Sequence, residues 1–401
     1  MSASNGRHYL AIPGPSAIPD EVLRAMHRPG PNIYGQPQGD LQAGLLADLK
    51  KVARTTQHAA MYIANGHGTW EAALANVLAC GDRVLVLATG RFAHGWATMA
   101  RQLGIETEVI DFGLRSPVDL QRVSDALAAD VNHRYKAVLA VHVDTATSVR
   151  NDIRGLRDVI DSANHPGLLM VDCIASLGCD PFETDALGVD VMVAACQKGL
   201  MTPPGLGFVF FSERAAQVRA QMRLVSSYWD WTKRCSPDEF YEYFCGTPPT
   251  HLLYGLRVAL DIILEEGMEA VWERHELLAR GIHAAVEAWG AKGPMELNIT
   301  NPEHRSCAVT AVRIGAPQGT QLRDWLSEQA GVTLGIGLGM ADRSDPEWHG
   351  FFRIGHMGHV NRQMVMGVLG SIDTGLKTLG IEHGNGALDA ASVALAGKHS
   401  V

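Results

Sequence analysis

Lys198 is the residue whose surroundings most clearly suggest chemistry. It is one of only eight lysines among 401 residues, and it lies between the apolar run Val-Met-Val-Ala-Ala-Cys-Gln and a segment rich in glycine and proline. Apolar surroundings disfavour the ammonium form, so the pKa falls and the neutral amine can form a Schiff base. The alternative is a lysine at a strand end whose ammonium group reaches solvent. The other lysines lie in charged or polar segments and are expected at the surface: Lys50, Lys51, Lys136, Lys233, Lys292, Lys377 and Lys398.

Asp172 ends a second apolar run, Gly-Leu-Leu-Met-Val-Asp at 167–172. A carboxylate at the C-terminal end of a buried strand lies where ligands bind in doubly wound sheets. There it can keep a pyridinium nitrogen protonated, and together with Lys198 it would make the pair that turns pyridoxal phosphate into an electron sink. The cap of a helix or turn is the ordinary alternative for such an aspartate.

A candidate phosphate site lies at 65–70, where Asn-Gly-His-Gly-Thr-Trp resembles a strand-to-helix turn. Backbone N–H groups at a helix N-terminus bind phosphate well, so Gly66, His67 and Gly68 are candidates. Such turns also cap many helices that bind no ligand, and His67 equally suits a structural role.

Two further side chains could face a ligand. Arg353 stands in the otherwise apolar run Phe-Phe-Arg-Ile-Gly, and a bidentate guanidinium suits the α-carboxylate of an amino acid. A structural salt bridge is an equally good interpretation. Phe92 begins a predicted helix and could stack on a cofactor ring, although an ordinary core position is the default.

Other chemistries lack their motifs. The sequence has no His-Glu-x-x-His, Cys-x-x-Cys or Gly-x-Ser-x-Gly pattern, which argues against zinc proteases, zinc ribbons and α/β hydrolases. His349, His356 and His359 flank a predicted strand end, and we predict no metal site there. The glycine run at 335–339 lacks the preceding strand and following helix of a dinucleotide site.

The elements that must position these residues alternate between strands and helices from about residue 60. Short β-branched runs predict strands at 61–64, 83–88, 106–110, 136–142, 168–172 and 190–195, with helices at 67–79, 92–103, 118–129 and 153–163. This order is typical of an α/β protein with a mainly parallel sheet. The run at 207–211 follows too short a gap for a crossover helix, so it is predicted to pair antiparallel.

The rest of the chain predicts a second, smaller α+β block. Helices are expected at 250–265, 268–289, 319–329 and 361–379, with strands at 307–313 and 351–354. We therefore expect an extended or turned N-terminal arm at 1–20, a large domain at 21–260 and a small domain at 261–401. The Gly/Ala/Ser-rich tail after about 384 is expected to be loose.

Composition narrows the functional classes. Hydrophobic residues make up 46% and charged residues 19%, as in ordinary globular proteins, and the net charge of −9 argues against nucleic acid and anionic membrane as partners. Seven scattered cysteines, without a secretory leader or a long apolar span, indicate a reducing compartment, and we predict a cytoplasmic protein.

Taken together, these residues resemble the class V aminotransferases of fold type I, and among them the serine–glyoxylate and alanine–glyoxylate branch. The resemblance covers nearly the whole chain. It rests on these motifs: Pro-Gly-Pro at 13–15, Gly-His-Gly at 66–68 with Trp-Glu-Ala-Ala-Leu at 70–74, Val-Asp at 171–172, Gln-Lys-Gly-Leu-Met at 197–201, Pro-Pro-Gly-Leu-Gly at 203–207, Thr-Pro-Pro at 247–249, Leu-Tyr-Gly-Leu-Arg at 253–257 and Phe-Arg-Ile-Gly-His at 352–356.

The resemblance implies roles in a pyridoxal phosphate site. Lys198 would carry the Schiff base and act as general acid and base, Asp172 would pair with the pyridine nitrogen, and Arg353 would bind the substrate carboxylate. The remaining implied contacts are Phe92 and Ile174 on the two ring faces, Gly66, His67, Gly68 and Gln197 at the phosphate, Thr145 near the ring hydroxyl or phosphate, Thr247 from the second subunit of a homodimer, and Tyr34 near the substrate.

The implied activity is transfer of an amino group from a small amino acid, of serine or alanine type, to a small 2-oxo acid such as glyoxylate. Two stretches depart from glyoxylate-using relatives: Asn-Ile-Tyr-Gly-Gln at 32–36 replaces an Asp-His-Arg-like stretch, and His-Val-Asp-Thr at 142–145 replaces His-Asn-Glu-Thr. The second stretch and the motif around Arg353 also resemble pyridoxamine–pyruvate aminotransferase, although that relative lacks the Gly-His motif. A lyase, a desulfurase or a non-catalytic protein of this fold are the remaining alternatives; a desulfurase would need a loop cysteine, which 331–344 lacks.

Overall fold

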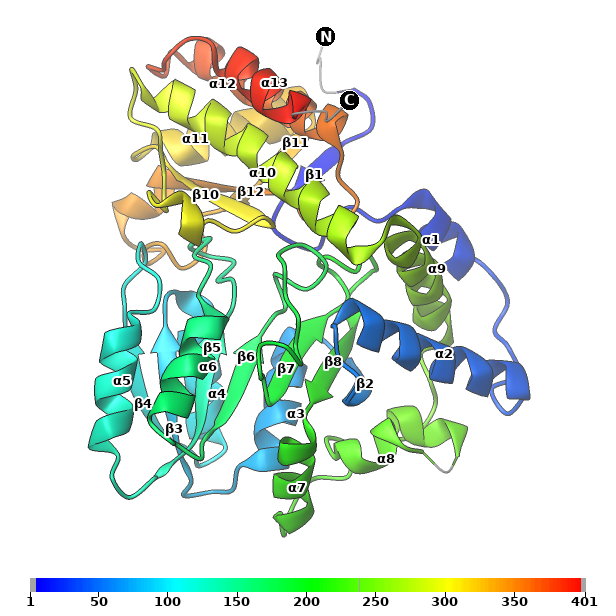
Figure 1. Ribbon diagram of the computed structural model, residues 1–401. Helices are drawn as coiled ribbons and strands as arrows, with labels where there is room; N and C mark the ends of the chain where they lie inside the picture. The colour runs from blue at the N-terminus through cyan, green and yellow to red at the C-terminus, as the bar shows by residue number, and fades with distance from the viewer. Residues whose placement is uncertain (1–4, 238, 398–401) are drawn as a thin grey trace.

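A seven-stranded sheet forms the larger half of the computed structural model, which describes residues 5–237 and 239–397 (Figure 1). Its strand order is β2-β8-β7-β6-β5-β3-β4, and β3 to β7 are parallel to their neighbours in that group. Strand β8 pairs antiparallel with both β7 and β2, as predicted, because too few residues separate β7 from β8 for a crossover. The strands are β2 (His58–Ala64), β3 (Arg83–Ala88), β4 (Glu106–Asp111), β5 (Tyr135–Val141), β6 (Leu168–Asp172), β7 (Val191–Ala195) and β8 (Gly205–Phe211).

Helices cover both faces of this sheet, and its strands are therefore buried on both sides. In β5, Val138 and Ala140 pack into one core, whereas Ala137, Leu139 and Val141 pack into the other. The first core includes α2 (Gln36–Val52), α5 (Leu120–Ala129), α6 (Ile153–Ser162) and α9 (Thr250–Glu266), and the second includes α3 (Gly66–Val77), α4 (Arg91–Gln102), α7 (Glu213–Gln221) and α8 (Trp231–Cys235). The predicted α/β class is confirmed.

A second sheet, above the first in Figure 1, has the order β1-β11-β12-β10-β9. Its first strand comes from the N-terminal arm: β1 pairs parallel with β11, with Tyr9 opposite Val332. The arm is extended, as expected, but the sequence does not reveal that it joins this sheet. The remaining elements are α1 (Asp20–Met26), β1 (Tyr9–Ala11), β9 (Glu296–Leu297), β10 (Val309–Arg313), β11 (Val332–Ile336), β12 (Phe351–Gly355), α10 (Met268–Gly290), α11 (Gln318–Trp325), α12 (Arg362–Leu379), α13 (Ala387–Ala396), short 3₁₀ helices at Phe240–Phe244, Pro302–His304 and Pro346–Gly350, and a π-helical turn at Leu326–Ala330.

Helix α10 contributes to the cores of both halves. Met268 and Val271, at its start, pack on the large-sheet core, whereas Leu278 and Ile282 pack in the core of the small sheet. The domain boundary near 260 stays a prediction.

None of the described helices combines the length and the apolar composition that a membrane-spanning segment needs.

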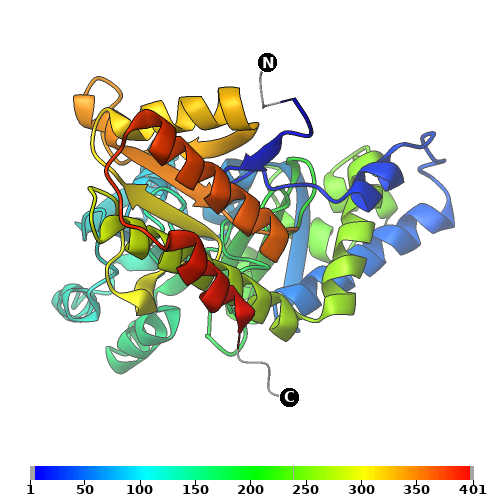
Figure 2. The same cartoon turned by 90° about the horizontal axis from the view of Figure 1, so that it is seen from above.

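The expectation of a loose tail after 384 is wrong for residues 387–396, which form α13. Its buried residues Ala387, Ala391 and Leu395 recur every four positions and so share one helix face. That face packs against α10, where a Cβ on Gly281 would lie 2.6 Å from Leu395 Cγ, so a larger residue there would displace the Leu395 side chain. Figure 2 shows α12 and α13, coloured toward red, and α13 packs against both α10 and α12. Residues 398–401, with Lys398, lie outside the described part.

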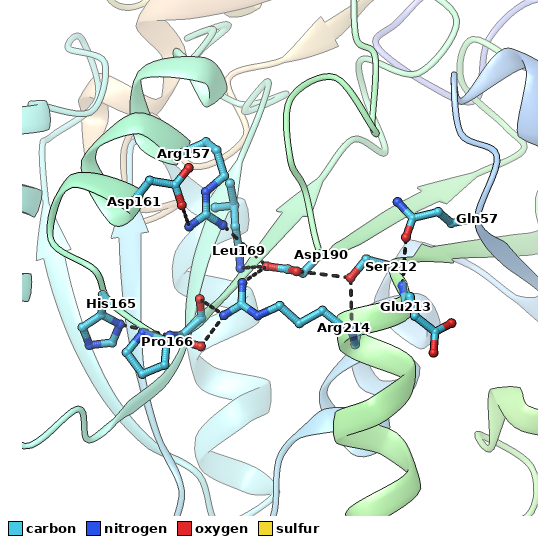
Figure 3. A network of polar contacts seen from close by, with 12 residues as sticks. Gln57, Arg157, Asp161, His165, Pro166, Leu169, Asp190, Ser212, Glu213 and Arg214 are labelled. Atoms are coloured by element: carbon cyan, nitrogen blue, oxygen red, sulfur yellow. Dashed lines mark hydrogen bonds and ion pairs between the residues drawn. The ribbon is translucent and has the colours of Figure 1, made fainter.

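A buried carboxylate, Asp190, ties together the N-terminal ends of β6 and β7 (Figure 3). It accepts hydrogen bonds from Leu169 N at 2.8 Å, Ser212 Oγ at 3.2 Å and Arg214 Nη1 at 3.1 Å, and Arg157 Nη1 lies 3.7 Å away. Burial raises the pKa of Asp190, and the neighbouring arginines oppose that rise. The network holds β6, β7 and β8 in register, and the opposite ends of the first two strands lead to the site described below.

Replacing Asp190 with asparagine is expected to lower the free energy of unfolding by about 3 kcal/mol, because Arg157 and Arg214 lose their shared charged partner. Urea unfolding followed by circular dichroism at pH 7 measures the change. The matched control is Asp161→Asn, which removes the exposed partner of Arg157 at 2.6 Å and is expected to cost less than about 1 kcal/mol. Equal losses of unfolding free energy in the two variants would contradict the stabilising role given to Asp190.

Candidate active site

The predicted catalytic residues meet at the C-terminal edge of the large sheet. Asp172 is the last residue of β6, and Lys198 follows the end of the adjacent parallel strand β7. The N-terminal arm closes over the lysine segment, because Ser16 donates from N to the Gln197 carbonyl at 2.9 Å and from Oγ to the Lys198 carbonyl at 2.7 Å. Parallel strands thus bring together two residues that the sequence separates.

Lys198 turns inward rather than toward solvent. Its Nζ donates to the carbonyl of Pro13 at 2.6 Å. Burial lowers the pKa of the ammonium group to about 8, and the positive charge of Arg353 adds to this, whereas Asp172 opposes it. The lowered pKa expected from the sequence is therefore supported, and a useful fraction of the amine is neutral near pH 8.

Asp172 is a buried carboxylate that accepts hydrogen bonds from two donors. Oδ1 accepts from the Ile174 N–H at 2.7 Å, and Oδ2 accepts from Trp70 Nε1 at 2.9 Å. Burial raises the pKa of Asp172 to about 7; Asp144 also raises it, whereas the two hydrogen bonds and Lys198 lower it. The group therefore changes charge in the neutral range and is sensitive to each of its partners.

Arg353 is buried in β12 and is oriented by two backbone carbonyls. Nε donates to Ile336 O and Nη1 to Thr145 O, both at 2.7 Å. Among residues 5–237 and 239–397, no carboxylate lies within ion-pair distance of its guanidinium, which disfavours the salt-bridge interpretation. Burial lowers the pKa of Arg353 to about 10, and the negative charge of Asp144 opposes this. A buried cation held by neutral acceptors is well suited to a carboxylate ligand.

The glycine turn begins helix α3, as predicted. Asn65 caps the helix by accepting from His67 N at 3.1 Å and Gly68 N at 3.2 Å. Gly66 packs closely against Ile174, so a Cβ here would require the Ile174 side chain to move. The side-chain oxygen of Gln197 is buried and has no hydrogen-bond partner among the described residues. An amide oxygen only accepts hydrogen bonds, so contact with a phosphate would have to come from the amide NH₂ of Gln197.

The remaining predicted contacts divide into two groups. Phe92 begins α4 close to Asp172, since its ring lies 6.3 Å from that of Trp70 in an edge-to-face arrangement, and Thr145 is linked to Arg353 as described. Tyr34 and Thr247 are exposed instead, in segments beside α2 and α9 at the flank of the molecule (Figure 1). A single chain therefore assembles the first group but not these two residues.

Sequence reasoning missed four contributors to the site. Trp70 donates to Asp172, Asp144 accepts from Phe92 N at 3.0 Å, and Pro13 and Ser16 bind the lysine segment. Trp70 had a detectable signal, because a bulky indole in the second turn of a helix must find room and a partner for its N–H. The arm contacts left no local signal.

Pyridoxal phosphate fits this set of residues. An amine of lowered pKa, an ionisable buried carboxylate and a glycine turn lie at one edge of the large sheet, and β12 of the small sheet contributes a buried guanidinium. Among the described residues, no group of three or more His, Cys, Asp or Glu side chains is placed to hold a metal ion.

Comparison with known proteins agrees with this chemistry. The family model of the class V aminotransferases matches residues 8–363. The chain is 37% identical to a serine–glyoxylate aminotransferase of Methylorubrum extorquens, over 96% of both chains, and 35% identical to an L-aspartate–glyoxylate aminotransferase of Paracoccus denitrificans, over 93% and 92%. It also superimposes on the pyridoxamine–pyruvate aminotransferase of Mesorhizobium loti with a TM-score of 0.84 and 25% identity, over 98% of both chains. The chain belongs to the class V aminotransferases and uses pyridoxal phosphate as its cofactor.

Proposed function

We propose that this aminotransferase moves an amino group from a small amino acid, of serine or alanine type, to a small 2-oxo acid such as glyoxylate, in two half-reactions at one site. The observation that carries the proposal is the buried guanidinium of Arg353, which two backbone carbonyls orient and which forms no ion pair with a carboxylate in the described part of the chain. Both substrates have a carboxylate next to the reacting carbon, and both can use the same cation. The printed names of the relatives, serine–glyoxylate and aspartate–glyoxylate aminotransferase, support the acceptor.

When bound, pyridoxal phosphate supplies a conjugated ring that withdraws electrons from the carbon bearing the amino group. Arg353 binds the substrate carboxylate and so fixes where that carbon stands. The neutral amine of Lys198 would take the proton from this carbon and pass it to the cofactor carbon that receives the amino group, as a base of pKa near 8 can do at neutral pH. In the second half-reaction it would move a proton in the opposite direction, onto the carbon of the 2-oxo acid. Ionised Asp172 holds the ring nitrogen in its protonated form, which favours electron withdrawal.

The homodimer, the roles of Tyr34 and Thr247, and the cytoplasmic location are parts of the same proposal. The exposure of both residues supports a role in the site of a neighbouring subunit, Thr247 at the phosphate and Tyr34 near the substrate. Free cysteines throughout the described chain support a reducing compartment. Sedimentation of the protein with the cofactor tests the dimer directly.

Desulfurase chemistry receives little support. Cys307, the cysteine nearest to the small-domain strands, is buried just before β10, and burial raises the pKa of its thiol. A buried thiol of raised pKa is a poor nucleophile. Sulfide release from L-cysteine would overturn this conclusion.

The visible absorption spectrum tests the proposed reaction. L-serine, L-alanine, L-aspartate and pyridoxamine are added separately to the purified enzyme containing pyridoxal phosphate. The proposal expects serine or alanine to bleach the band of the lysine-linked cofactor and glyoxylate to restore it. If pyridoxamine alone gives a reaction that pyruvate reverses, the pyridoxamine–pyruvate alternative is correct. A band that no donor changes contradicts transamination of these substrates.

Replacing Arg353 with lysine is expected to raise KM for the amino donor by about 10–100-fold, because one ammonium group cannot make the paired hydrogen bonds of a guanidinium. The change in kcat should be smaller, since carboxylate binding is shared by the ground and transition states. Steady-state kinetics at saturating glyoxylate measure both constants. Arg313→Lys, on the neighbouring strand β10, is the matched control and should leave KM unchanged.

Capture of pyridoxal phosphate by the cofactor-free protein should accelerate as pH rises toward about 8 and level off above it. Only the neutral amine attacks the aldehyde, and the lowered pKa of Lys198 sets the midpoint. Stopped-flow absorbance between pH 6 and 10 measures the rate. The reference is Nα-acetyl-lysine, whose amine has a pKa of about 10.4; the same midpoint in the protein would contradict the assignment.

A further inference from the structure

Trp70 makes a direct contact with the acidic member of the site. It lies in the second turn of α3, its side chain is 1% exposed, and its Nε1–H donates to Asp172 Oδ2 at 2.9 Å. The other hydrogen bond to this carboxylate comes from a backbone group, the N–H of Ile174, at Oδ1. Trp70 is therefore the side-chain donor that a substitution can remove without altering the backbone.

Neighbouring rings fix the direction of this N–H. The Trp70 indole stacks on Trp96 with centroids 6.0 Å apart and planes 16° apart, and the His67 ring lies 4.5 Å away on a tilted plane. On α4, a Cβ at Gly95 would lie 3.3 Å from Trp70 Cζ3, so a glycine accommodates the ring. Packing therefore holds the indole in one orientation, whether or not it makes the hydrogen bond.

We propose that Trp70 is a positioning residue for the reaction: its indole N–H fixes the orientation of Asp172 and holds that carboxylate in its ionised form. The proposal rests on the proposed role of Asp172 at the ring nitrogen. An indole N–H is a donor only and does not titrate, so it stabilises a carboxylate over a carboxylic acid. A second donor matters here because the site is buried and because Asp144 lies near enough to disfavour a further negative charge.

The hydrogen bond from Trp70 leaves acceptor positions of Asp172 free to bind the ring nitrogen. Two carboxylate oxygens offer about four acceptor positions, and two of these are taken by Ile174 N and Trp70 Nε1. The positions left over can accept a proton-bearing ring nitrogen. Without the indole, a carboxylate buried in this site would be protonated over more of the neutral range, and a protonated acid cannot pair with a cationic ring.

The test compares Trp70→Phe with Trp96→Phe. The two residues stack on each other, but Trp96 Nε1 is buried and bonds nothing among the described residues, so its replacement changes packing and leaves the Asp172 hydrogen bonds in place. In cofactor-free protein labelled at the aspartate carboxyl carbons, Trp70→Phe should raise the pKa of Asp172 by about 1–2 units. Asp172→Asn identifies the resonance. Trp96→Phe should leave that pKa unchanged.

The same shift should appear in the enzyme with cofactor. The acid limb of kcat/KM should move to higher pH by about 1–2 units in Trp70→Phe, with activity recovering toward the wild-type value near pH 9. A purely structural defect would lower activity at every pH. An unshifted limb, or an equal shift in Trp96→Phe, overturns the proposal.

A measurement on the unaltered chain guards against a variant that does not fold. The indole N–H resonance of Trp70 should titrate with the same midpoint as the Asp172 carboxyl carbon and should stop titrating in Asp172→Asn. A resonance that is insensitive to pH overturns the proposal. These spectra need no substrate, so they stand even if the donor and acceptor proposed above are wrong.

Discussion

Replacing Lys198 with alanine should abolish transamination and lower kcat by at least about 10²–10⁴-fold. The variant loses both the amine that captures the cofactor and the group that carries the proton at the reacting carbon. Its three electrostatic partners among the described residues are poor replacements: Asp172 is a carboxylate, Arg353 is a guanidinium whose pKa is about 10, and Cys179 is a buried thiol whose pKa burial raises to about 12. Initial rates with glyoxylate and the amino donor that the spectral test selects, together with the visible band of the cofactor, measure both losses.

The fold should survive this substitution. Lys198 donates one hydrogen bond, to Pro13 O, whereas Ser16 holds the surrounding segment through the backbone carbonyls of Gln197 and Lys198. Circular dichroism should therefore match that of the wild-type protein. Lys377→Ala is the control, because this lysine is exposed and pairs with Asp373 on the same helix; it should keep full activity. Turnover by Lys198→Ala at the wild-type rate would contradict the role of Lys198 in binding the cofactor and moving the proton.

The sequence predicted much of the fold because the signals are local. Strands β3 and β6 end where their apolar runs end, and the short gap before β8 predicted its antiparallel pairing. Lys198 and Asp172 were found for the same reason, since each is a polar residue at the end of an apolar run. Chain geometry then placed them together, because neighbouring parallel strands end at the same edge.

What the sequence did not reveal depends on packing between distant segments. Strand β11, which we did not predict, contains Gly335, and the glycine is needed because Pro13 packs against it: a Cβ there would lie 2.6 Å from Pro13 Cδ. Gly355 makes similar room for the backbone of Ile12. Nothing in the neighbouring sequence explains why glycine occupies these two positions. The reason is their contact with the N-terminal arm in the folded structure.

The arm consequently joins the two halves of the site. Its strand β1 extends the small sheet, which carries Arg353, and the residues after it bind the lysine segment of the large sheet. Arg353 and Lys198, the groups proposed to bind the substrate carboxylate and to move the proton, thus belong to different sheets with one short segment between them. The hydrogen bond between Trp70 and Asp172 likewise depends on how α3 is set on the sheet, which residue spacing alone does not predict.

Replacing Asp172 with asparagine should lower kcat by about 10²–10³-fold while leaving the fold intact. Asparagine has nearly the same shape and can still accept a hydrogen bond from the Ile174 N–H, but it carries no charge to hold a protonated ring nitrogen. The pKa of Asp172, about 7 in the wild-type chain, also predicts the direction of the pH dependence. Activity should rise as pH increases through the neutral range, because only ionised Asp172 serves the reaction. The asparagine variant should lack the part of this rise that is centred near pH 7 and keep the part that Lys198 sets near pH 8.

Asp180→Asn separates loss of charge at the site from loss of a buried aspartate in general. Asp180 is fully buried, burial raises its pKa, and it accepts from Ser306 Oγ and Cys307 N instead of facing the lysine. Its replacement should reduce stability in urea and change kcat by less than about threefold, since it removes no charge from the reacting centre. If both variants lost activity equally, with parallel losses of stability, then Asp172 would act by supporting the fold. A large loss confined to Asp172→Asn, together with the missing pH limb, would show that its charge is what the reaction requires.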